Sequence, residues 1–331
     1  MSALSWLVVA LALAGTAALV RGLRRRADSA AARRFFAPPA TAFGLGVLIF
    51  FVLIALLAPL ASAYAPSAQL GIVSLQSRPP SWQHLLGTDL YSRDVWSRLA
   101  FGARVSLGIG ALATLVSLGL GALVGAAAGY FRRAADAVLM RIVDAGLAIP
   151  RIFLVLAAIA VGRPLGVVPL ALLLGLTGWF ATSRLVRAEV LSLRERGWVE
   201  GARAVGVGPW RIIWRHVLPG TASVLIVAAA LGVANVMLLE AGLSFLGVGV
   251  QPPVPSWGNM IADARDQLAT APWASLFPGL AITLAVMALH AVADGLRHAL
   301  QPGAPVRARE PSPPRRVRPG LPRAPGAEAI H

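Results

Sequence analysis

Long apolar segments separated by arginine-bearing gaps dominate this 331-residue sequence, of which 57% is hydrophobic. A helix needs about 20 mostly apolar residues to cross a bilayer, and backbone groups inside the bilayer must be hydrogen-bonded within the protein. The sequence therefore predicts an all-α, polytopic membrane helical bundle with a six-helix core and one extra N-terminal transmembrane helix. The predicted spans are residues 3–20, 43–60, 102–130, 138–161, 167–183, 221–246 and 271–292.

The charged residues predict how the bundle is oriented. Lysine and arginine together number thirty, and because the chain contains no lysine, all thirty are arginine. Most of these arginines lie in alternate gaps between the spans. Cytoplasmic loops carry an excess of positive charge, so we expect an exterior N-terminus and a cytoplasmic C-terminus. The same rule accounts for the net charge of +16. Nucleic acid is not an expected partner, because no basic helix is interleaved with aromatic residues that could stack on bases.

The distribution of apolar and basic residues also divides the chain into parts. The first apolar segment is expected to be an uncleaved anchor, since its arginines follow it, whereas those of a secretory signal come first. The C-terminal residues are rich in proline and arginine, which is typical of disorder. The predicted parts are an anchor at 1–20, a basic cytoplasmic linker at 21–42, a transmembrane domain at 43–301 with an exterior loop at 63–100 and a cytoplasmic loop at 184–219, and a disordered cytoplasmic tail at 302–331.

No catalytic or metal-binding constellation emerges from the sequence. Without cysteine, the chain has neither a thiolate nucleophile nor a thiolate metal ligand. Without lysine, it has no Gly-Lys-Ser/Thr ending for a phosphate-binding P-loop, and its five histidines show no metal-ligand spacing. The sequence therefore predicts a chain that is not an enzyme, binds no metal or cofactor itself and takes any ATP energy from a partner.

A polar, arginine-bearing stretch at residues 200–219 interrupts the apolar pattern. We expect Gly206 and the Gly208–Pro209 pair to break it into two short helices, because glycine permits turn conformations and proline suits the first turn of a helix. A bent amphipathic helix pair of this kind is suited to the groove of a partner protein. The face expected to be apolar on the second helix carries Ile213, Trp214 and Val217.

This stretch resembles the EAA loop, the cytoplasmic loop of ABC importer permeases. It departs from the EAA pattern at Gly201, where alanine is usual, and at His216, where the general motif has an aliphatic residue. The alternative interpretation is an ordinary positively charged loop. The resemblance implies a set of ATPase-coupling residues, in which the arginines would meet acidic groups of the ATPase. These residues are Glu200, Gly201, Ala202, Arg203, Gly206, Arg211, Arg215, His216 and Pro219.

Two further stretches resemble exterior loops of the dipeptide, oligopeptide and nickel branch of these permeases. Residues 84–94 are similar to the signature HxLGTDxxGRD, with Ser92 in place of glycine. Residues 243–260 are similar to the signature LSFLGxGxQPPxPSWGxM. The second loop either helps to dock a soluble binding protein or is a lid that only packs. The motif residues are Gly87, Thr88, Asp89, Arg93, Asp94, Pro252 and Trp257.

The first of these signatures also has a structural interpretation, which we favour over direct contact with substrate. Thr88 or Asp89 is expected to cap the N-terminus of an exterior helix. The spacing of Asp89 and Arg93, and of Asp94 and Arg98, predicts two i,i+4 ion pairs.

Taken together, residues 43–302 resemble a MetI-like permease subunit of the dipeptide/oligopeptide/nickel ABC importer family, of the C type found in permease heterodimers. The resemblance implies a multi-pass protein of the bacterial inner membrane, embedded in lipid. Its partners would be a second homologous permease, two cytoplasmic ATPase subunits that hold ATP and magnesium, and an exterior solute-binding protein. Closing of the ATPases would draw residues 200–219 together and drive alternating access. The solute, whether peptide, glutathione-like compound or nickel chelate, stays open.

Three ionisable residues at membrane depth are candidates for the translocation pathway. Such groups are costly in a bilayer and usually face a bundle interior or an aqueous cavity. For Arg151, a place in the pathway and pairing with a carbonyl or acid of a neighbouring helix are equal alternatives. The three are too few and too scattered to favour an ion-coupled secondary carrier, which is the alternative function. They are Asp144, Arg151 and Glu240.

Glycines recur every fourth residue in the span at 102–130, at Gly121, Gly125 and Gly129. Small residues at this spacing lie on one face of a helix and let a second helix approach closely. The pattern therefore predicts a tight helix crossing.

Overall fold

The computed structural model describes residues 3–27, 29–71, 73–161 and 165–300, and within them the chain is helical, with an isolated bridge as its only β pairing. Among these residues, five helices are long and apolar enough to cross a membrane, and two bent helix pairs bring the number to seven if each pair is one span. The predicted all-α bundle is confirmed, whereas the predicted tail at 302–331 lies outside the described residues. The elements are α1 (Ala3–Arg25), α2 (Ala30–Phe35), α3 (Pro39–Leu56), α4 (Ala58–Ala61), α5 (Val95–Phe131), α6 (Arg133–Ala148), α7 (Arg151–Val161), α8 (Val167–Leu176), α9 (Trp179–Leu193), α10 (Gly197–Ala204), α11 (Pro209–Ile212), the π-helical turn η1 (Ile213–Val217), α12 (Leu218–Gly220), α13 (Ala222–Phe245), α14 (Trp257–Ala264), the 3₁₀ turn η2 (Arg265–Gln267) and α15 (Trp273–Leu300).

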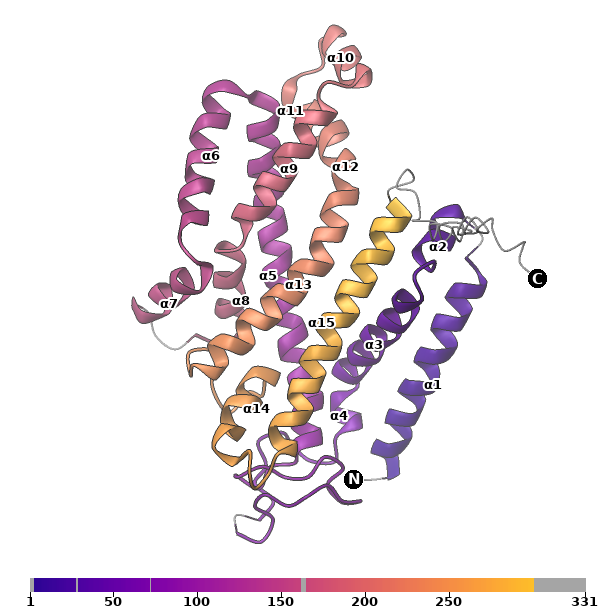
Figure 1. The fold of residues 1–331 in the computed structure, drawn as a ribbon, viewed down its shortest axis with the longest axis vertical. Helices are drawn as coiled ribbons and strands as arrows, with labels where there is room; N and C mark the ends of the chain where they lie inside the picture. Colours follow the sequence, from indigo (N-terminus) through magenta and orange to yellow (C-terminus); the bar gives the residue numbers. More distant parts are fainter. Residues whose placement is uncertain (1–2, 28, 72, 162–164, 301–331) are drawn as a thin grey trace, which may run out of the picture.

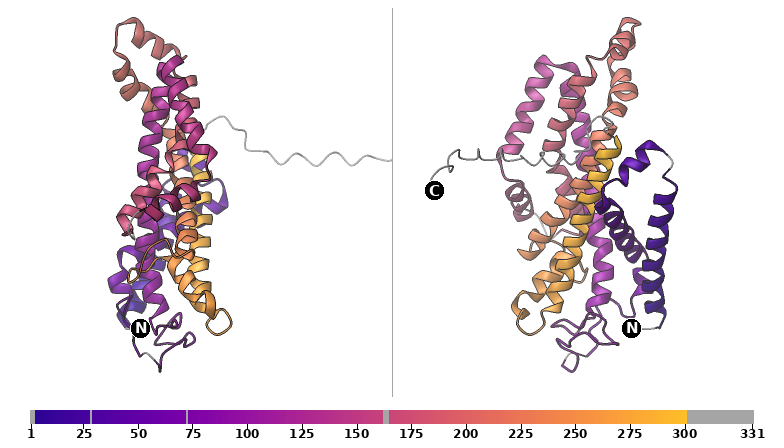
Figure 2. Two further views of the ribbon diagram at one scale, coloured as in Figure 1. Left: turned by 90° about the vertical axis from the view of Figure 1, so that its left-hand side faces the viewer. Right: turned by 45° about the vertical axis from the view of Figure 1, so that its right-hand side comes forward.

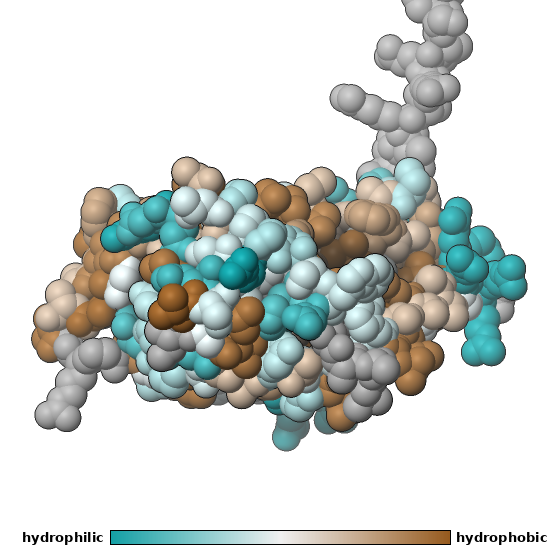
Figure 3. Space-filling view, turned by 90° about the horizontal axis from the view of Figure 1, so that it is seen from below, coloured by the Kyte–Doolittle hydropathy of each residue, from teal (hydrophilic) through white to brown (hydrophobic). Residues whose placement is uncertain are grey.

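The long bundle has two distinct ends (Figure 1). The short elements α10, α11 and α12 project from one end, whereas α14 and the loop before α5 lie at the other, beside the start of α1. Seen from this second end, polar side chains gather over the centre and apolar ones along much of the margin (Figure 3), as expected of a bundle whose sides face lipid.

Helix α5 starts at Val95 rather than at residue 102, so the exterior loop is shorter than predicted. Asp94 is the N-cap, and its Oδ2 accepts a hydrogen bond from the Ser97 amide at 2.8 Å. The cap is therefore neither Thr88 nor Asp89, which is a correction to the sequence interpretation. A helix of 37 residues is about 55 Å long at 1.5 Å per residue, and α5 consequently extends beyond the bilayer core.

The glycine ridge of α5 lies directly against α9, and the predicted close crossing is confirmed. The absence of side chains lets the two backbones approach, which is how small residues stabilise helix pairs in membranes. A Cβ built at Gly121, Gly125 or Gly129 would lie 2.5 Å from Thr182 Cβ, 2.5 Å from the Ser183 carbonyl oxygen or 2.9 Å from Val190 Cβ, respectively.

Two of the predicted spans are bent. Helices α6 and α7 meet at 84° and α8 and α9 at 43°. Pro150 lies in the first break, where it cannot donate a backbone hydrogen bond, and Gly178 lies in the second. The first bend turns α7 away from the long axis (Figure 1), and residues of both breaks line a cavity beside α5.

Helix α1 is peripheral to the bundle. It runs alongside α3 (Figures 1 and 2) and buries Ala12 and Thr16 in that contact region. At the α14 end of the bundle, the Trp6 ring lies 6.1 Å from that of Trp82 in the exterior loop. Helix α1 contributes none of its described residues to the main hydrophobic core near this end. That core joins α3, α13, α14 and α15 around Phe51, Trp257 and Met237.

Candidate functional site

The stretch at 200–219 folds as two short helical pieces joined by a turn at Gly206. That residue has a φ of +81°, a left-handed conformation that favours glycine, and α11 begins with Pro209 in its first turn. The predicted break is confirmed. The second piece does not end near Pro219, however, because η1 and α12 lead it directly into α13. Likewise, the first ten residues of the predicted loop at 184–219 continue α9 to Leu193.

The inner face of this element packs on the ends of α5 and α9. Val199, Ile213 and Val217 are buried there, in a cluster that includes Tyr130. The prediction that Trp214 shares this face is wrong, since its side chain is 59% exposed. Within the π-helical turn η1, Ile213 and Val217 face the bundle, and the three residues between them, Trp214 included, are exposed.

The outer face of the same element is a mixture of exposed aromatic and charged residues, here called the coupling surface. It includes every predicted coupling residue except Ala202, which is half-buried. Exposed large apolar side chains are typical of interaction sites when they gather among polar residues. Within the described chain, the Glu200 carboxylate and the guanidiniums of Arg211 and Arg215 have no hydrogen-bond or ion-pair partner. The exposed apolar members are Trp198, Val205, Trp210 and Trp214.

A second group of arginines fixes the coupling surface to the bundle. Arg194 Nη1 donates to the Tyr130 carbonyl oxygen at 2.7 Å, and the Arg203 guanidinium lies 5.0 Å from the Tyr130 ring centre. Arg132 Nη2 pairs with Glu195 at 2.7 Å. Burial, together with repulsion from Arg132 and Arg203, lowers the pKa of Arg194 from its ordinary value. Arg203, predicted as a contact for an ATPase, therefore already has a partner in Tyr130.

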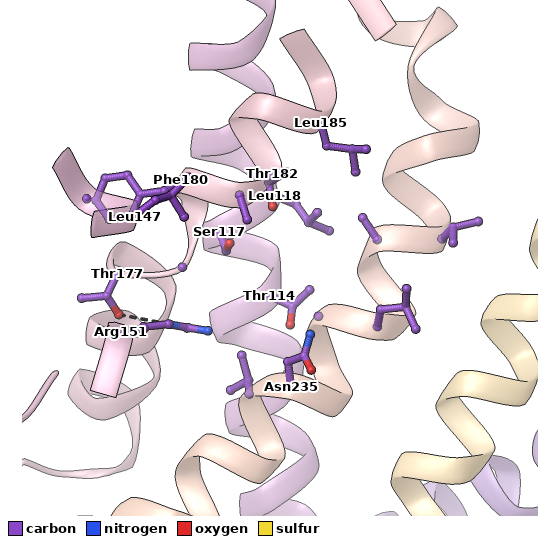
Figure 4. A pocket seen from close by; sticks show the side chains of 18 of the residues that line it. Thr114, Ser117, Leu118, Leu147, Arg151, Thr177, Phe180, Thr182, Leu185 and Asn235 are labelled. Atoms are coloured by element: carbon purple, nitrogen blue, oxygen red, sulfur yellow. Dashed lines mark hydrogen bonds between the residues drawn. The ribbon is translucent and has the colours of Figure 1, made fainter. Parts of the chain in front are cut away.

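A cavity of about 730 Å³ lies between α5, α13 and the two bent helix pairs (Figure 4). Arg151 at the start of α7 extends into it, and its Nη2 donates to the Leu174 carbonyl oxygen while Nε lies 3.5 Å from Thr177 Oγ1. These contacts satisfy the last turn of α8, where carbonyl groups lack helical partners. Arg151 thus pairs with a carbonyl of a neighbouring helix, which is one of the two alternatives, and it also lines this cavity. Its place in a translocation pathway stays a prediction.

The other two pathway candidates lie elsewhere. Asp144 of α6 pairs with Arg184 of α9, and both side chains are about half exposed. Glu240 is buried and accepts hydrogen bonds from the hydroxyls of Ser244 at 2.7 Å and Ser256 at 2.8 Å. Neither residue is among those that line the cavity. The structure therefore does not bring the three candidates together.

The signature at residues 84–94, which is predicted to be exterior, forms a largely buried ion cluster around Asp89. Asp89 Oδ2 accepts from Arg93 Nε and from Arg98 Nη1, both at 2.7 Å, so the predicted Asp89–Arg93 pair is confirmed. The predicted side-chain pair of Asp94 with Arg98 is wrong. Arg98 and Arg93 instead share Asp263 of α14, at 3.0 and 2.8 Å. The cluster ties the exterior loop to α14.

Other motif residues surround this cluster as structural supports. His84 Nδ1 lies 3.0 Å from Asp94 Oδ1, and Gly87 turns the chain with a φ of +77°. Thr88 is fully buried, and its carbonyl oxygen accepts from Trp273 Nε1 at 3.0 Å. These contacts agree with the structural interpretation of the signature, in which its residues hold the loop.

The second exterior signature is packed at Trp257 and exposed at Pro252. Trp257 is fully buried; its Nε1 donates to the Leu99 carbonyl oxygen at 3.0 Å and its backbone amide to Ser106 Oγ at 3.1 Å. Pro252 lies at the surface. Trp257 thus packs into the bundle, whereas Pro252 is exposed, and the choice between a docking loop and a packing lid stays a prediction.

Comparison with known proteins identifies the family. Residues 121–304 match the binding-protein-dependent transport system inner membrane component. The chain belongs to this family. Residues 29–80 also match the N-terminal transmembrane domain of oligopeptide transport permease C. The extra helix α1 of the permease precedes both matched segments.

Curated relatives cover most of the permease. A putative peptide transport system permease protein of Brucella suis biovar 1 (strain 1330) is 41% identical over 82% of this chain and 90% of the relative. A dipeptide transport system permease protein of Alkalihalophilus pseudofirmus (strain ATCC BAA-2126 / JCM 17055 / OF4) is 40% identical over 78% of this chain and 84% of the relative. The permease is thus a multi-pass inner membrane protein of this transport family.

Sequence reasoning missed several residues of the two candidate sites. Thr114 and Ser117 line the cavity from α5, and Asp263 completes the exterior ion cluster. The two hydroxyls lie three residues apart in an apolar span, which places them on one helix face and was an available signal. Asp263 gave no local signal, because its partners are far away in the sequence.

Proposed function

We propose that this permease is the membrane-spanning subunit of an ATP-driven, binding-protein-dependent importer of di- or oligopeptides. The observation that carries the proposal is the match to proteins named peptide and dipeptide permeases over about four fifths of the chain. The exposed coupling surface supports it, because a transporter without its own ATP-binding motif needs a place to receive work from an ATPase.

In the proposed assembly, this chain pairs with a second permease, two cytoplasmic ATPase subunits hold ATP and magnesium, and a solute-binding protein docks on the exterior end. The unpaired Glu200, Arg211 and Arg215 and the exposed tryptophans contact the ATPases. ATP-driven closing of the ATPases moves the coupling surface, and the buried cluster around Tyr130 passes that motion to α5 and α9. The cavity then alternates between inward and outward access.

The proposed orientation places the coupling surface in the cytoplasm and the start of α1 outside. Arg21, Arg24 and Arg25 lie in the last turns of α1 and Arg26 follows it, and α1 runs from the α14 end of the bundle towards the coupling surface (Figure 1), which suits the positive-inside rule. The chain has no cysteine, so single cysteines test this directly. An impermeant thiol reagent added outside intact cells should label Ser67→Cys and not Ser192→Cys, and the reverse pattern would refute the orientation.

The coupling role is tested with glycine variants in the complete transporter. Gly206→Ala forces a left-handed conformation on alanine at a cost of about 1–2 kcal/mol, whereas Gly201 lies in an ordinary helical conformation with nothing within 4 Å of an added Cβ. We expect Gly206→Ala and Glu200→Lys to lower ATP-dependent peptide uptake by about tenfold or more with the complex still assembled, and Gly201→Ala to transport normally. Normal peptide uptake by Gly206→Ala and Glu200→Lys would refute the coupling assignment.

The alternative, an ion-coupled carrier, predicts a different result when peptide uptake is measured in membrane vesicles that contain the transporter. A carrier would take up peptide without ATP or ATPase subunits, and collapse of the proton and sodium gradients would stop it. The proposed importer needs ATP and the binding protein and is insensitive to those gradients.

A further inference from the structure

The lining of the cavity is positively charged, which favours an anionic ligand. Its lining contains no acidic residue among the described positions, and its two charged members are Arg151 and Arg297. Arg297 lies near the end of α15 and faces Asp294 at 3.4 Å. Arg151 has no acidic partner in the described chain and lies at membrane depth, where an unpaired charge is costly and typical of a functional site.

Arg151 is held so that part of its guanidinium faces the cavity. Its Nε and Nη2 are directed to Thr177 and Leu174, whereas Nη1 has no hydrogen-bond partner in the described chain. Gly178 provides the room, since a Cβ there would lie 2.8 Å from Arg151 Nη2 and 3.1 Å from Ser117 Oγ. The guanidinium points towards the wall formed by α5 and α13 (Figure 4).

An unpartnered hydroxyl on this wall is the second, independent sign of a ligand. Thr114 is only 3% exposed, and its Oγ1 has no hydrogen-bond partner in the described structure. Most buried polar side chains are hydrogen-bonded, because an unpaired one costs about 1–3 kcal/mol. The exposed amide of Asn235 lies beside Thr114 in the cavity (Figure 4) and supplies both a donor and an acceptor.

We infer that this cavity binds the free carboxylate end of a peptide through Arg151, with Thr114 and Asn235 hydrogen-bonding the adjacent peptide group. The inference rests on the proposed peptide import. A guanidinium is the side chain best suited to a carboxylate, since its planar donors match the two oxygens. Cavities of about 300–1,000 Å³ are typical of small-ligand sites, and this one, at about 730 Å³, falls in that range.

Protection of a single cysteine tests the site in the complete transporter. Ser117→Cys is placed beside the guanidinium in a chain that has no other cysteine, and its rate of reaction with a small water-soluble maleimide is measured. We expect trialanine to slow labelling about fivefold or more, and the C-terminal amide of trialanine to leave the rate unchanged. Ser192→Cys, exposed at the far end of α9, is the matched control and should label equally with and without peptide.

Two substitutions decide whether Arg151 and Thr114 are responsible. Adding Arg151→Met should abolish protection. Thr114→Val keeps the side-chain shape and removes a hydroxyl that has no partner, so it should leave assembly intact while raising the trialanine concentration for half-protection about five- to tenfold. If the Arg151→Met variant does not assemble, the Thr114→Val variant alone tests the proposed site.

The results separate this inference from the proposed function. Peptide uptake without protection of Ser117→Cys, equal protection by trialanine and its amide, or unchanged protection in Thr114→Val would overturn the carboxylate site and leave peptide import standing. Absence of ATP-dependent uptake of any peptide would instead overturn the proposed function.

Discussion

Gly125 offers the sharpest test of the α5–α9 crossing. A Cβ added there would lie 2.5 Å from the Ser183 carbonyl oxygen, 2.9 Å from Val186 Cβ and 3.0 Å from the Arg187 amide nitrogen. Two of these atoms belong to the α9 backbone, so no side-chain rotation relieves the overlap. Gly125→Ala therefore forces the two helices apart.

The matched control is Gly119→Ala in the same helix, where nothing lies within 4 Å of an added Cβ. Replacing glycine by alanine in a helix is itself favourable by about 1 kcal/mol, and this gain is common to both variants. Their difference isolates the steric overlap with α9, for which overpacking gives about 1–3 kcal/mol. Gly119→Ala should thus be stabilising by about 1 kcal/mol, and Gly125→Ala should range from neutral to destabilising by about 2 kcal/mol.

The assay is thermal unfolding of the purified permease in detergent, followed by the fluorescence of its nine tryptophans. A change of 1 kcal/mol shifts the midpoint by about 2–4 °C in a domain of 150–250 residues, so the two variants should differ by at least about 2 °C. Equal midpoints would refute the inference that α5 and α9 touch through their backbones at this glycine.

Three further predictions concern single contacts. Asp263→Ala removes an acid shared by the buried Arg98 and the partly buried Arg93, both of which keep Asp89, and should destabilise the permease by about 1.5–3 kcal/mol, measured as a lower unfolding midpoint. Glu240→Gln keeps an acceptor for the two serine hydroxyls and should unfold close to the wild type, whereas Glu240→Leu leaves both without their acceptor and should cost about 1–3 kcal/mol for each. Gly178→Ala overlaps the flexible end of Arg151 and comes within 3.1 Å of the Ser117 hydroxyl, both of them side-chain groups, so it should lower peptide uptake while the unfolding midpoint stays near that of the wild type.

Features with a local period were predictable from the sequence. The glycine ridge follows from a repeat of four within one helix, and the turn at Gly206 follows from the conformational freedom of glycine. Both depend on residues that are neighbours along the chain. The apolar spans were likewise found because bilayer thickness sets their length.

Features decided by distant contacts were not predictable. Thr88, Asp89 and Asp94 are all competent N-caps, and tertiary partners select Asp94, because Asp89 is drawn to the two arginines. Asp263 lies about 170 residues from those arginines, so no spacing rule reaches it. The cavity depends on the bends beside α5, whose angles the sequence does not specify.

Helix α5 connects the candidate sites physically. Its first turns hold Arg98 in the exterior ion cluster, its middle presents Thr114 to the cavity, and its last turn places Tyr130 under the coupling surface. It contains no proline, and its backbone is in close contact with α9 along the glycine ridge, so neither helix bends easily there without separating from the other. We therefore expect a displacement at Tyr130 to move the cavity wall as well. The flexible joints are then expected at the breaks of α6–α7 and α8–α9. Arg151 begins α7 at the first break and its guanidinium contacts Thr177 at the second. A change in either bend angle is therefore expected to alter its position relative to Thr114.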